Sequence, residues 1–178
     1  MSLQHIVAAT AAGTTDLVHG VPAERWHAPT PCRDWDVETL TGHLFQVVAA
    51  LDLAGHGQPI PAGHWQRDCT GATIAADWAA PPEKIDMSGM VLPGETVVAM
   101  LVGDLVLHGW DLARATGQPF APAADALRMT AGFVGAFAAQ GREQGLFGEP
   151  VPVPGDASLL DRTLGLSGRD PSWTRPVG

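Results

Sequence analysis

The stretch from Glu95 to Thr116 constrains the fold more than any other part of the chain, because it is helical in pattern and apolar on most of its sides. A helix that is apolar nearly all round is buried, so other elements must surround it. Gly117 follows this stretch directly, and glycine commonly ends a helix in the left-handed conformation. We therefore expect a protein whose interior is built around residues 95–116.

Two earlier segments also predict long helices. Residues 3–19 place apolar side chains near helical spacing, with Ser2 available as the N-cap. Residues 37–55 follow Asp36, a good N-cap, and carry a continuous apolar stripe. The proline- and tryptophan-rich segment between them is expected to be an extended loop.

The remaining segments give weaker or shorter elements. Residues 66–80 form a weaker helical candidate that two prolines stop, and residues 84–94 alternate imperfectly, which favours a short hairpin. Residues 123–140 predict another helix, and residues 158–173 hold a short amphipathic one. The expected core contacts of the 123–140 helix are Leu127, Phe133, Val134 and Phe137.

These elements predict an all-α fold, namely an antiparallel four-helix bundle with a short extended hairpin and extra C-terminal helices. A chain of 178 residues suits one domain, and no linker or repeat divides it, so we expect residues 1–178 to form a single domain. Bundles of this kind commonly build metal sites from inward-facing side chains.

Composition excludes several classes of function. The formal charge of −9 and the absence of a basic stripe argue against nucleic-acid binding. The N-terminus lacks the features of a signal peptide and no 18-residue apolar run occurs, so neither export nor a membrane span is expected. Cys32 and Cys69 are 37 residues apart with no CxxC pairing, which indicates free thiols in a reducing cytosol.

The strongest candidate site lies on the apolar helix. Asp104 and His108 stand four residues apart, so their side chains can converge on one ion. His43, within the apolar stripe of residues 37–55, is the best third ligand, and Asp111 could accept a hydrogen bond that orients an imidazole. Two histidines and one carboxylate suit zinc, non-haem iron, nickel or manganese.

A plainer interpretation stays open from spacing alone. Asp104 and Asp111 could be solvated carboxylates, with Asp111 paired to Arg114 three residues later, and a single inward histidine is more often a hydrogen-bonded core residue. Arg114 and Arg169 could receive an anionic substrate, although structural pairing with Asp111 and Asp170 is the better interpretation.

Other reactive side chains have weaker signals. Cys32 precedes the second helix and could act as nucleophile or ligand, but no partner base is apparent and packing is the favoured interpretation. His56 and His64 flank a glycine- and proline-bearing loop and are expected to be solvated.

Three segments together carry a family resemblance: WHAPTPCRDWDVETLTGHLFQVV (residues 26–48), LVLHGWDLARATGQP (105–119) and FGEPVPVPGDASLLDRTLGLSGRDPSW (147–173). The chain resembles the mycothiol-dependent maleylpyruvate isomerase N-terminal, metal-binding family of the DinB/YfiT-like superfamily. Its abundance of arginine, alanine, glycine and proline is typical of a GC-rich genome, and the resemblance is to small, single-domain actinobacterial members.

The resemblance implies a DinB-like four-helix bundle that holds a divalent metal, commonly zinc or nickel, through one histidine of the second helix and an ExxxH pair of a later helix. These positions fall on His43, Asp104 and His108. Asp104 departs from the pattern, because aspartate is shorter than glutamate by roughly 1.5 Å. The helix could sit closer to the ion, a water could intervene, or affinity could be lower.

The resemblance also implies chemistry. Characterised relatives use the metal to bind a small thiol, mycothiol, as the thiolate that attacks an electrophile. We therefore expect a cytoplasmic, metal-dependent S-transferase or isomerase that acts on an unknown electrophile, as a monomer or homodimer. The alternative is a non-catalytic bundle that binds metal or ligand as a sensor or structural module.

Overall fold

The computed structural model describes residues 2–74 and 80–176. Its helices and strands are, in chain order, α1 (Leu3–His19), α2 (Val37–Gly55), β1 (Lys84–Met87), β2 (Met90–Pro93), α3 (Gly94–Thr116), α4 (Ala124–Glu143) and α5 (Leu159–Leu166). Two short 3-10 helices, Ala23–Arg25 and Ala62–Gln66, lie in the connections on either side of α2. The prediction of a mostly helical fold with one small hairpin is confirmed.

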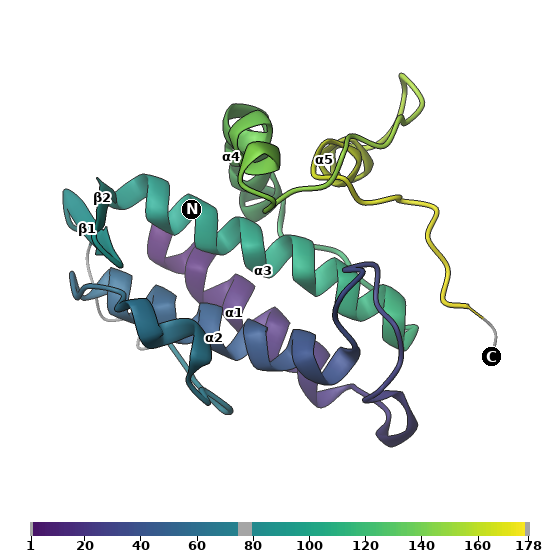
Figure 1. Cartoon of the computed structure of the whole chain (residues 1–178), viewed down its shortest axis with the longest axis horizontal. Coiled ribbons are helices and arrows are strands. Elements are labelled where there is room, and N and C mark those ends of the chain that lie inside the picture. Colours follow the sequence, from purple (N-terminus) through teal and green to yellow (C-terminus); the bar gives the residue numbers. More distant parts are fainter. Residues whose placement is uncertain (1, 75–79, 177–178) are drawn as a thin grey trace.

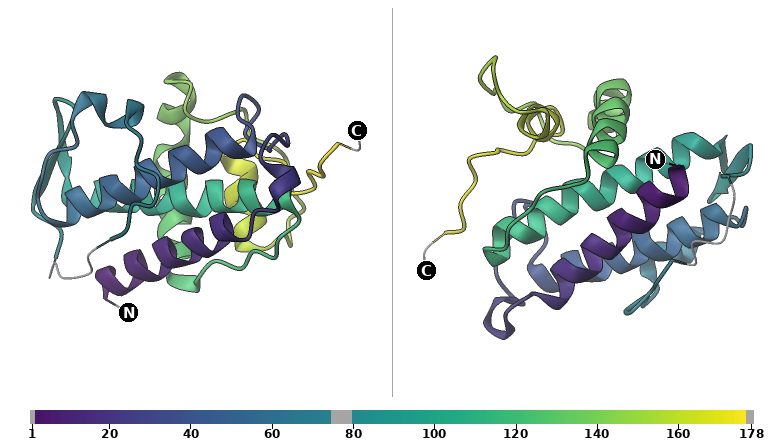
Figure 2. Two further views of the ribbon diagram at one scale, coloured as in Figure 1. Left: turned by 90° about the horizontal axis from the view of Figure 1, so that it is seen from below. Right: turned by 180° about the vertical axis from the view of Figure 1, so that it is seen from behind.

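α3 lies at the centre of the molecule (Figure 1). α1 and α2 run along one side of it, with α2 antiparallel to both α1 and α3 (Figure 2). α4 packs across the opposite side of α3 at a steep angle, and α5 packs against α4. The apolar helix is therefore surrounded, as its composition requires.

The helix ends follow from their capping residues. The Ser2 hydroxyl accepts a hydrogen bond from the His5 backbone N–H at 3.4 Å, which caps α1. The Asp36 carboxylate accepts one from the backbone N–H of Thr39 at 2.9 Å and so begins α2. Gly117 ends α3 with a φ of +78°, the left-handed conformation that glycine adopts at low cost.

The main core lies between α3 and the two helices beside it. The apolar stripe of α2 meets buried side chains of α3, and together they include Leu40, Leu44, Leu51, Leu101, Leu105 and Leu112. A second, smaller cluster joins α3 to α4 and α5 through Leu107, Trp110, Val134, Ala138 and Leu164. Burial on both sides fixes the rotation of α3, and so fixes where its polar residues lie.

Within the described residues, α3 is the single helix long and apolar enough to cross a membrane. Most of it is buried inside the protein, and the core helix of a soluble protein passes the same test. The hydropathy of α3 is therefore explained by its central place in the fold.

The hairpin β1–β2 is antiparallel, with Ile85 opposite Leu92. Its two-residue turn is Ser88–Gly89, and both residues have positive φ, as the tight turns that match strand twist require. Ile60 pairs with Met87 as an isolated bridge, which ties the hairpin to the segment after α2.

Two expectations were wrong. The helical candidate 66–80 is not a helix over residues 67–74, where the Asp68 carboxylate accepts from the Thr70 backbone N–H at 2.9 Å and Gly71 has a φ of +78°. Residues 75–79 lie outside the described residues. Phe137, expected in the core, is exposed and stacks on Phe133, since α4 turns only one narrow face toward α3.

Candidate metal centre

The neighbouring helices α2 and α3 bring His43 and Asp104 together. His43 Nε2 lies 3.1 Å from Asp104 Oδ2. Both side chains are partly buried, with 17% of His43 and 32% of Asp104 exposed. The pair therefore lies at the edge of the core, where a small molecule could approach.

His108, one turn after Asp104 on α3, completes a group of three. Its Nε2 lies 3.4 Å from Asp104 Oδ1, and ligand atoms from His43, Asp104 and His108 all lie within 4.8 Å of one another. A tetrahedral ion held at 2.0–2.1 Å separates its ligand atoms by about 3.4 Å. The two histidine–carboxylate distances, 3.1 and 3.4 Å, are thus close to the separation that a shared divalent cation imposes.

The charge of Asp104 depends on the two histidines. Burial alone would raise the pKa of this carboxyl, but the hydrogen bond from His43 and the nearby His108 outweigh burial and lower it to about 2. Asp104 is therefore a carboxylate at neutral pH, as a metal ligand must be.

The other ring nitrogen of His108 has its own partner. Nδ1 lies 2.9 Å from Oδ2 of Asp111, whose side chain is completely buried. A carboxylate can only accept, so Nδ1 must carry the proton and donate. In the neutral ring, Nε2 then carries a lone pair that faces the Asp104 carboxylate. Nε2 and the carboxylate oxygen are both acceptors, so a proton or a cation must lie between them.

Asp111 is paired to Arg169 and not to Arg114. Arg169 Nη2 lies 2.8 Å from Asp111 Oδ2, and its Nε lies 3.0 Å from Oδ1. Arg114 instead donates to the backbone carbonyl of Pro171 and lies over the Trp110 ring. The suggested Asp111–Arg114 pair was therefore wrong. Structural pairing of Arg169 is confirmed, but its partner is Asp111, while the Asp170 carboxylate accepts from Ser172.

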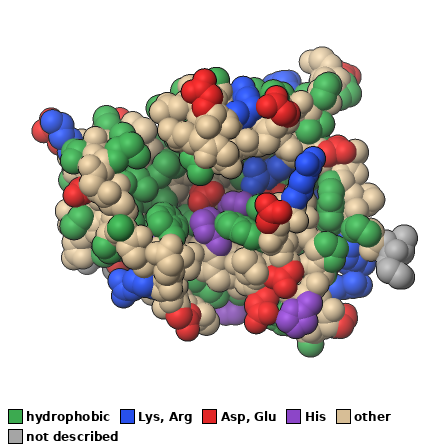
Figure 3. Space-filling view, viewed as in Figure 1, with side chains coloured by type: hydrophobic (Ala, Val, Ile, Leu, Met, Phe, Trp, Pro, Cys, Tyr) green, Lys and Arg blue, Asp and Glu red, His purple; other side chains and the backbone are tan. Residues whose placement is uncertain are grey.

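Aromatic rings cover the two imidazoles. The Trp35 ring centroid lies 4.8 Å from that of His43 and 5.3 Å from that of His108, and Trp65 lies 5.7 Å from His43. Sequence reasoning missed both contacts, although Trp35 belongs to the TPC-x-x-W pattern that it had singled out. Figure 3 shows histidine and acidic atoms in a hollow of this face, next to hydrophobic side chains.

Cys32 lies close enough to the candidate centre that the charged side chains there act on its thiol. Burial, and after it the Asp111 carboxylate, raise the pKa of Cys32 to about 11 against the opposing effect of Arg169. The thiol is therefore protonated at neutral pH and is a poor nucleophile. This agrees with the packing role expected for Cys32.

His64 is buried, contrary to expectation, with 1% of the residue exposed. Its Nε2 lies 2.7 Å from the backbone carbonyl of Gln46 on α2, and its ring packs edge-on against Trp65. His64 therefore holds the segment that carries Trp65 against α2. His56 lies at the end of α2, where its Nδ1 bonds to the Asp52 backbone carbonyl.

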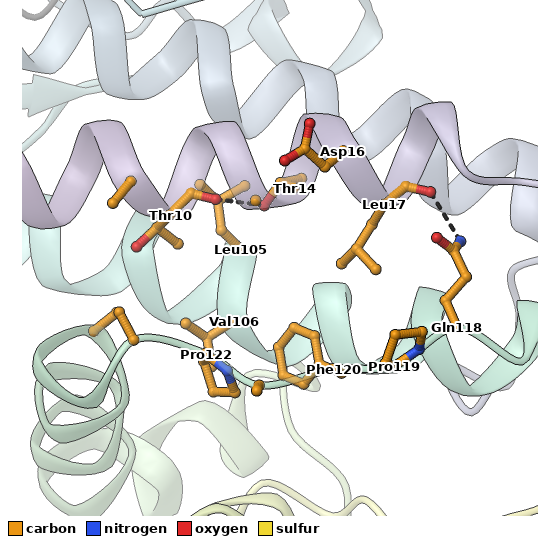
Figure 4. A pocket seen from close by; sticks show the side chains of 15 residues that line it. Thr10, Thr14, Asp16, Leu17, Leu105, Val106, Gln118, Pro119, Phe120 and Pro122 are labelled. Carbon is orange, nitrogen blue, oxygen red and sulfur yellow. Dashed lines mark hydrogen bonds between the residues drawn. The ribbon is translucent and has the colours of Figure 1, made fainter.

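Two other features of the described residues lie apart from this centre. His27, Asp36 and Glu38 come close together, but the His27 side chain is 80% exposed and Asp36 caps α2. A cavity of about 350 Å³ lies between α1, α3 and the segment before α4 (Figure 4). The hydroxyls of Thr10 and Thr14 beside it bond back to carbonyls of α1.

Comparison with known proteins gives one family and two relatives. Residues 7–86 match the model of the mycothiol maleylpyruvate isomerase N-terminal domain, a range that includes His43 and ends before α3. Two uncharacterized proteins of Mycobacterium tuberculosis, from two strains, are each 29% identical over 113 residues. The alignment covers 57% of this chain and 60% of each relative. No solved structure matches the chain.

Proposed function

Because residues 7–86 match the mycothiol maleylpyruvate isomerase N-terminal domain, we propose that this protein binds a divalent metal ion and uses it to activate a small thiol. The ligands in this proposal are His43, Asp104 and His108, and Asp111 orients His108. The reaction class is S-transfer to an electrophile or its thiol-dependent isomerisation.

One observation carries the proposal. The Asp104 carboxylate turns one oxygen to Nε2 of His43 and the other to Nε2 of His108, at 3.1 and 3.4 Å. For His108 the opposite nitrogen already donates to Asp111, so Nε2 is free to bind a cation. An ordinary core histidine does not need two carboxylates on its two nitrogens.

The donor set narrows the identity of the ion. Imidazole nitrogen suits zinc, nickel, copper and iron, whereas calcium and magnesium prefer sites made only of oxygen. Three protein ligands leave a coordination position open, as in catalytic zinc sites. We propose zinc or nickel, in agreement with the ions that the resemblance implies.

The residues around the ligands prepare the site for thiol chemistry. Trp35 and Trp65 pack against the imidazoles and limit the access of water, which strengthens electrostatic interactions inside the site. When bound, the divalent cation would keep a small thiol such as mycothiol deprotonated and so supply a sulfur nucleophile for an electrophilic substrate. Cys32 does not compete for this role, because its thiol is held protonated.

The experiment that tests the proposal measures metal in the purified, untagged protein, with His43→Ala and His108→Ala beside the matched control His5→Ala. His5 lies exposed at the start of α1. We expect near-stoichiometric zinc or nickel in the wild type and the control, and less than a tenth of that content in the two site variants. A chelator should lower the wild-type melting temperature, because a ligand of the native state stabilises it.

A second measurement separates catalysis from binding. Loss of mycothiol is followed with model electrophiles, using the metal-loaded wild type and the His108→Ala variant. Turnover that the variant lacks supports the thiol-dependent enzyme. Bound metal without turnover across a broad panel supports the non-catalytic alternative, and equal metal content in all four proteins contradicts the metal site itself.

A further inference from the structure

Arg169 reaches the candidate centre from the far end of the chain. It follows α5, yet its guanidinium lies against Asp111 on α3, 58 residues earlier. The contact is bidentate, because Nε donates to Oδ1 at 3.0 Å while Nη2 donates to Oδ2 at 2.8 Å. Arg169 is 11% exposed and Asp111 is fully buried, so water does not screen the pair.

The turn before Arg169 fixes the position of this residue beside α3. Gly168 has a φ of +87°, and a Cβ at this position would lie 2.5 Å from the Cα of Gly148. The next residue bonds back to α5, since the backbone N–H of Arg169 donates to the Leu164 carbonyl at 2.9 Å. Neither a different residue at 168 nor a looser turn is compatible with this close approach.

Asp111 joins Arg169 to His108. Its Oδ2 accepts from both Arg169 Nη2 and His108 Nδ1. Arg169 donates to both oxygens of this carboxylate, so Asp111 has no proton of its own to offer His108. The carboxylate therefore stays an acceptor, which leaves the proton on Nδ1 of His108.

We propose that Arg169 is a positioning residue of the metal centre, which holds Asp111 so that His108 turns Nε2 toward the ion. This inference rests on the proposed function, because it assigns the residue that sets the geometry of one of the proposed ligands. Arg169 is a cation and has no role as a ligand, and its donors contact Asp111 and Ser167. Its Nη2 also lies 3.3 Å from His108 Nδ1, because both nitrogens approach the same Asp111 oxygen.

The chain supplies a matched control for this proposal. Arg114 also ties α3 to the C-terminal segment, through the Pro171 carbonyl at 2.9 Å, but it does not contact Asp111. Arg114→Gln thus removes one arginine from the same contact region, while Arg169→Gln removes the arginine that positions His108. Arg169→Lys keeps the charge but cannot make the bidentate contact.

The first test uses the metal-free protein, so it is independent of the proposed function. Nitrogen-15 NMR of the imidazoles identifies the protonated nitrogen of each histidine, and a His108→Gln spectrum assigns the signals of His108. We expect the Nδ1–H form at His108 in the wild type and Arg114→Gln, and a mixture of both forms in Arg169→Gln. An unchanged Nδ1–H form in Arg169→Gln overturns the proposal.

The second test measures the affinity of the same proteins for Zn²⁺ and Ni²⁺ by competition with a chelating dye. Loss of a residue that orients a ligand lowers metal affinity roughly 10–100-fold. We expect Arg169→Gln near the lower end of that range, Arg169→Lys between it and the wild type, and Arg114→Gln within about twofold of the wild type.

Each other outcome has a definite meaning. Equal losses in Arg114→Gln and Arg169→Gln assign the effect to docking of the C-terminal segment and overturn the proposal. If Arg169→Gln does not fold by circular dichroism, Arg169→Lys decides, and wild-type affinity in that variant also overturns it. A wild type that binds neither ion contradicts the proposed function, while the NMR test of Arg169 stands.

Discussion

Asp104 Oδ2 and His43 Nε2 lie 3.1 Å apart, although 61 residues separate them in the chain. Asp104 stands where the family pattern has glutamate, and its shorter side chain still meets an imidazole of the neighbouring helix. Direct ligation by this shorter carboxylate, through a closer approach of the helix, is therefore the explanation that we test first.

The Asp104→Asn variant tests direct ligation by this carboxylate. It keeps the shape of the side chain and removes its charge, so we expect metal affinity to fall by at least about tenfold. Affinity for Zn²⁺ is measured by dye competition. Asp34→Asn, an exposed carboxylate in the loop before α2, controls for the loss of one charge. Equal affinity of both variants would show that Asp104 acts only through long-range attraction.

The reactivity of Cys32 should follow its raised pKa. In the Cys69→Ser background Cys32 is the one remaining cysteine, and its alkylation by iodoacetamide requires the thiolate. For the metal-free protein, we expect slow alkylation at neutral pH and a rate that rises toward a midpoint of about pH 11. A midpoint near the ordinary thiol value would contradict burial of this side chain.

Removal of the cap of α2 should cost stability in a pH-dependent manner. Asp36→Ala is expected to lower the free energy of unfolding by about 1 kcal/mol at pH 7. Hydrogen bonds from Thr39 hold the pKa of Asp36 below its usual value. Its contribution is therefore complete above the unfolded pKa of roughly 3.9 and is lost as the pH falls through the lower folded value. Urea unfolding at several pH values measures the difference.

This pH dependence has a control in the same loop. Asp34→Ala removes an exposed carboxylate that caps no helix, and its effect should stay within about 0.5 kcal/mol. If the cost of Asp36→Ala did not shrink between pH 5 and pH 3, the charged cap would not be its origin.

Trp35 should report on metal binding. Its ring lies within 5.3 Å of both ligand imidazoles, measured between ring centroids, so a bound open-shell ion such as Ni²⁺ would quench its fluorescence. We expect Ni²⁺ to quench the wild type more strongly than Trp35→Phe. Trp173→Phe, in the cluster beside α4 and α5, is the control and should keep the wild-type response. Identical quenching in all three proteins would place the ion elsewhere.

The long helices were predictable because their signals are local. Residues 3–19 and 37–55 carry both a cap and an apolar periodicity, and the observed helices have these same bounds. The candidate 66–80 had a helix-compatible composition but no capping residue. A local turn, in which Asp68 accepts from the Thr70 backbone N–H, forms there in place of a helix. Local hydrogen bonds of this kind compete directly with helix formation.

The partners of the site residues were less predictable. His43, Asp104 and His108 were correctly expected to converge, because helical spacing and the resemblance both pointed to them. The Trp35 contact was missed, since it depends on how a loop folds over two helices. The partner of Asp111 is Arg169, 58 residues later in the chain. The prediction had instead chosen Arg114, because it lies one helical turn away.

The close approach of Gly148 and Gly168 places Arg169 against Asp111, so assembly of the centre depends on when this turn forms during synthesis. Asp111 leaves the ribosome 58 residues before Arg169, so it has no guanidinium partner until the turn at Gly168 has formed. A nascent chain that acquires metal early would hold it in an unfinished site. Maturation of the centre is therefore expected to follow docking of the segment that carries Arg169.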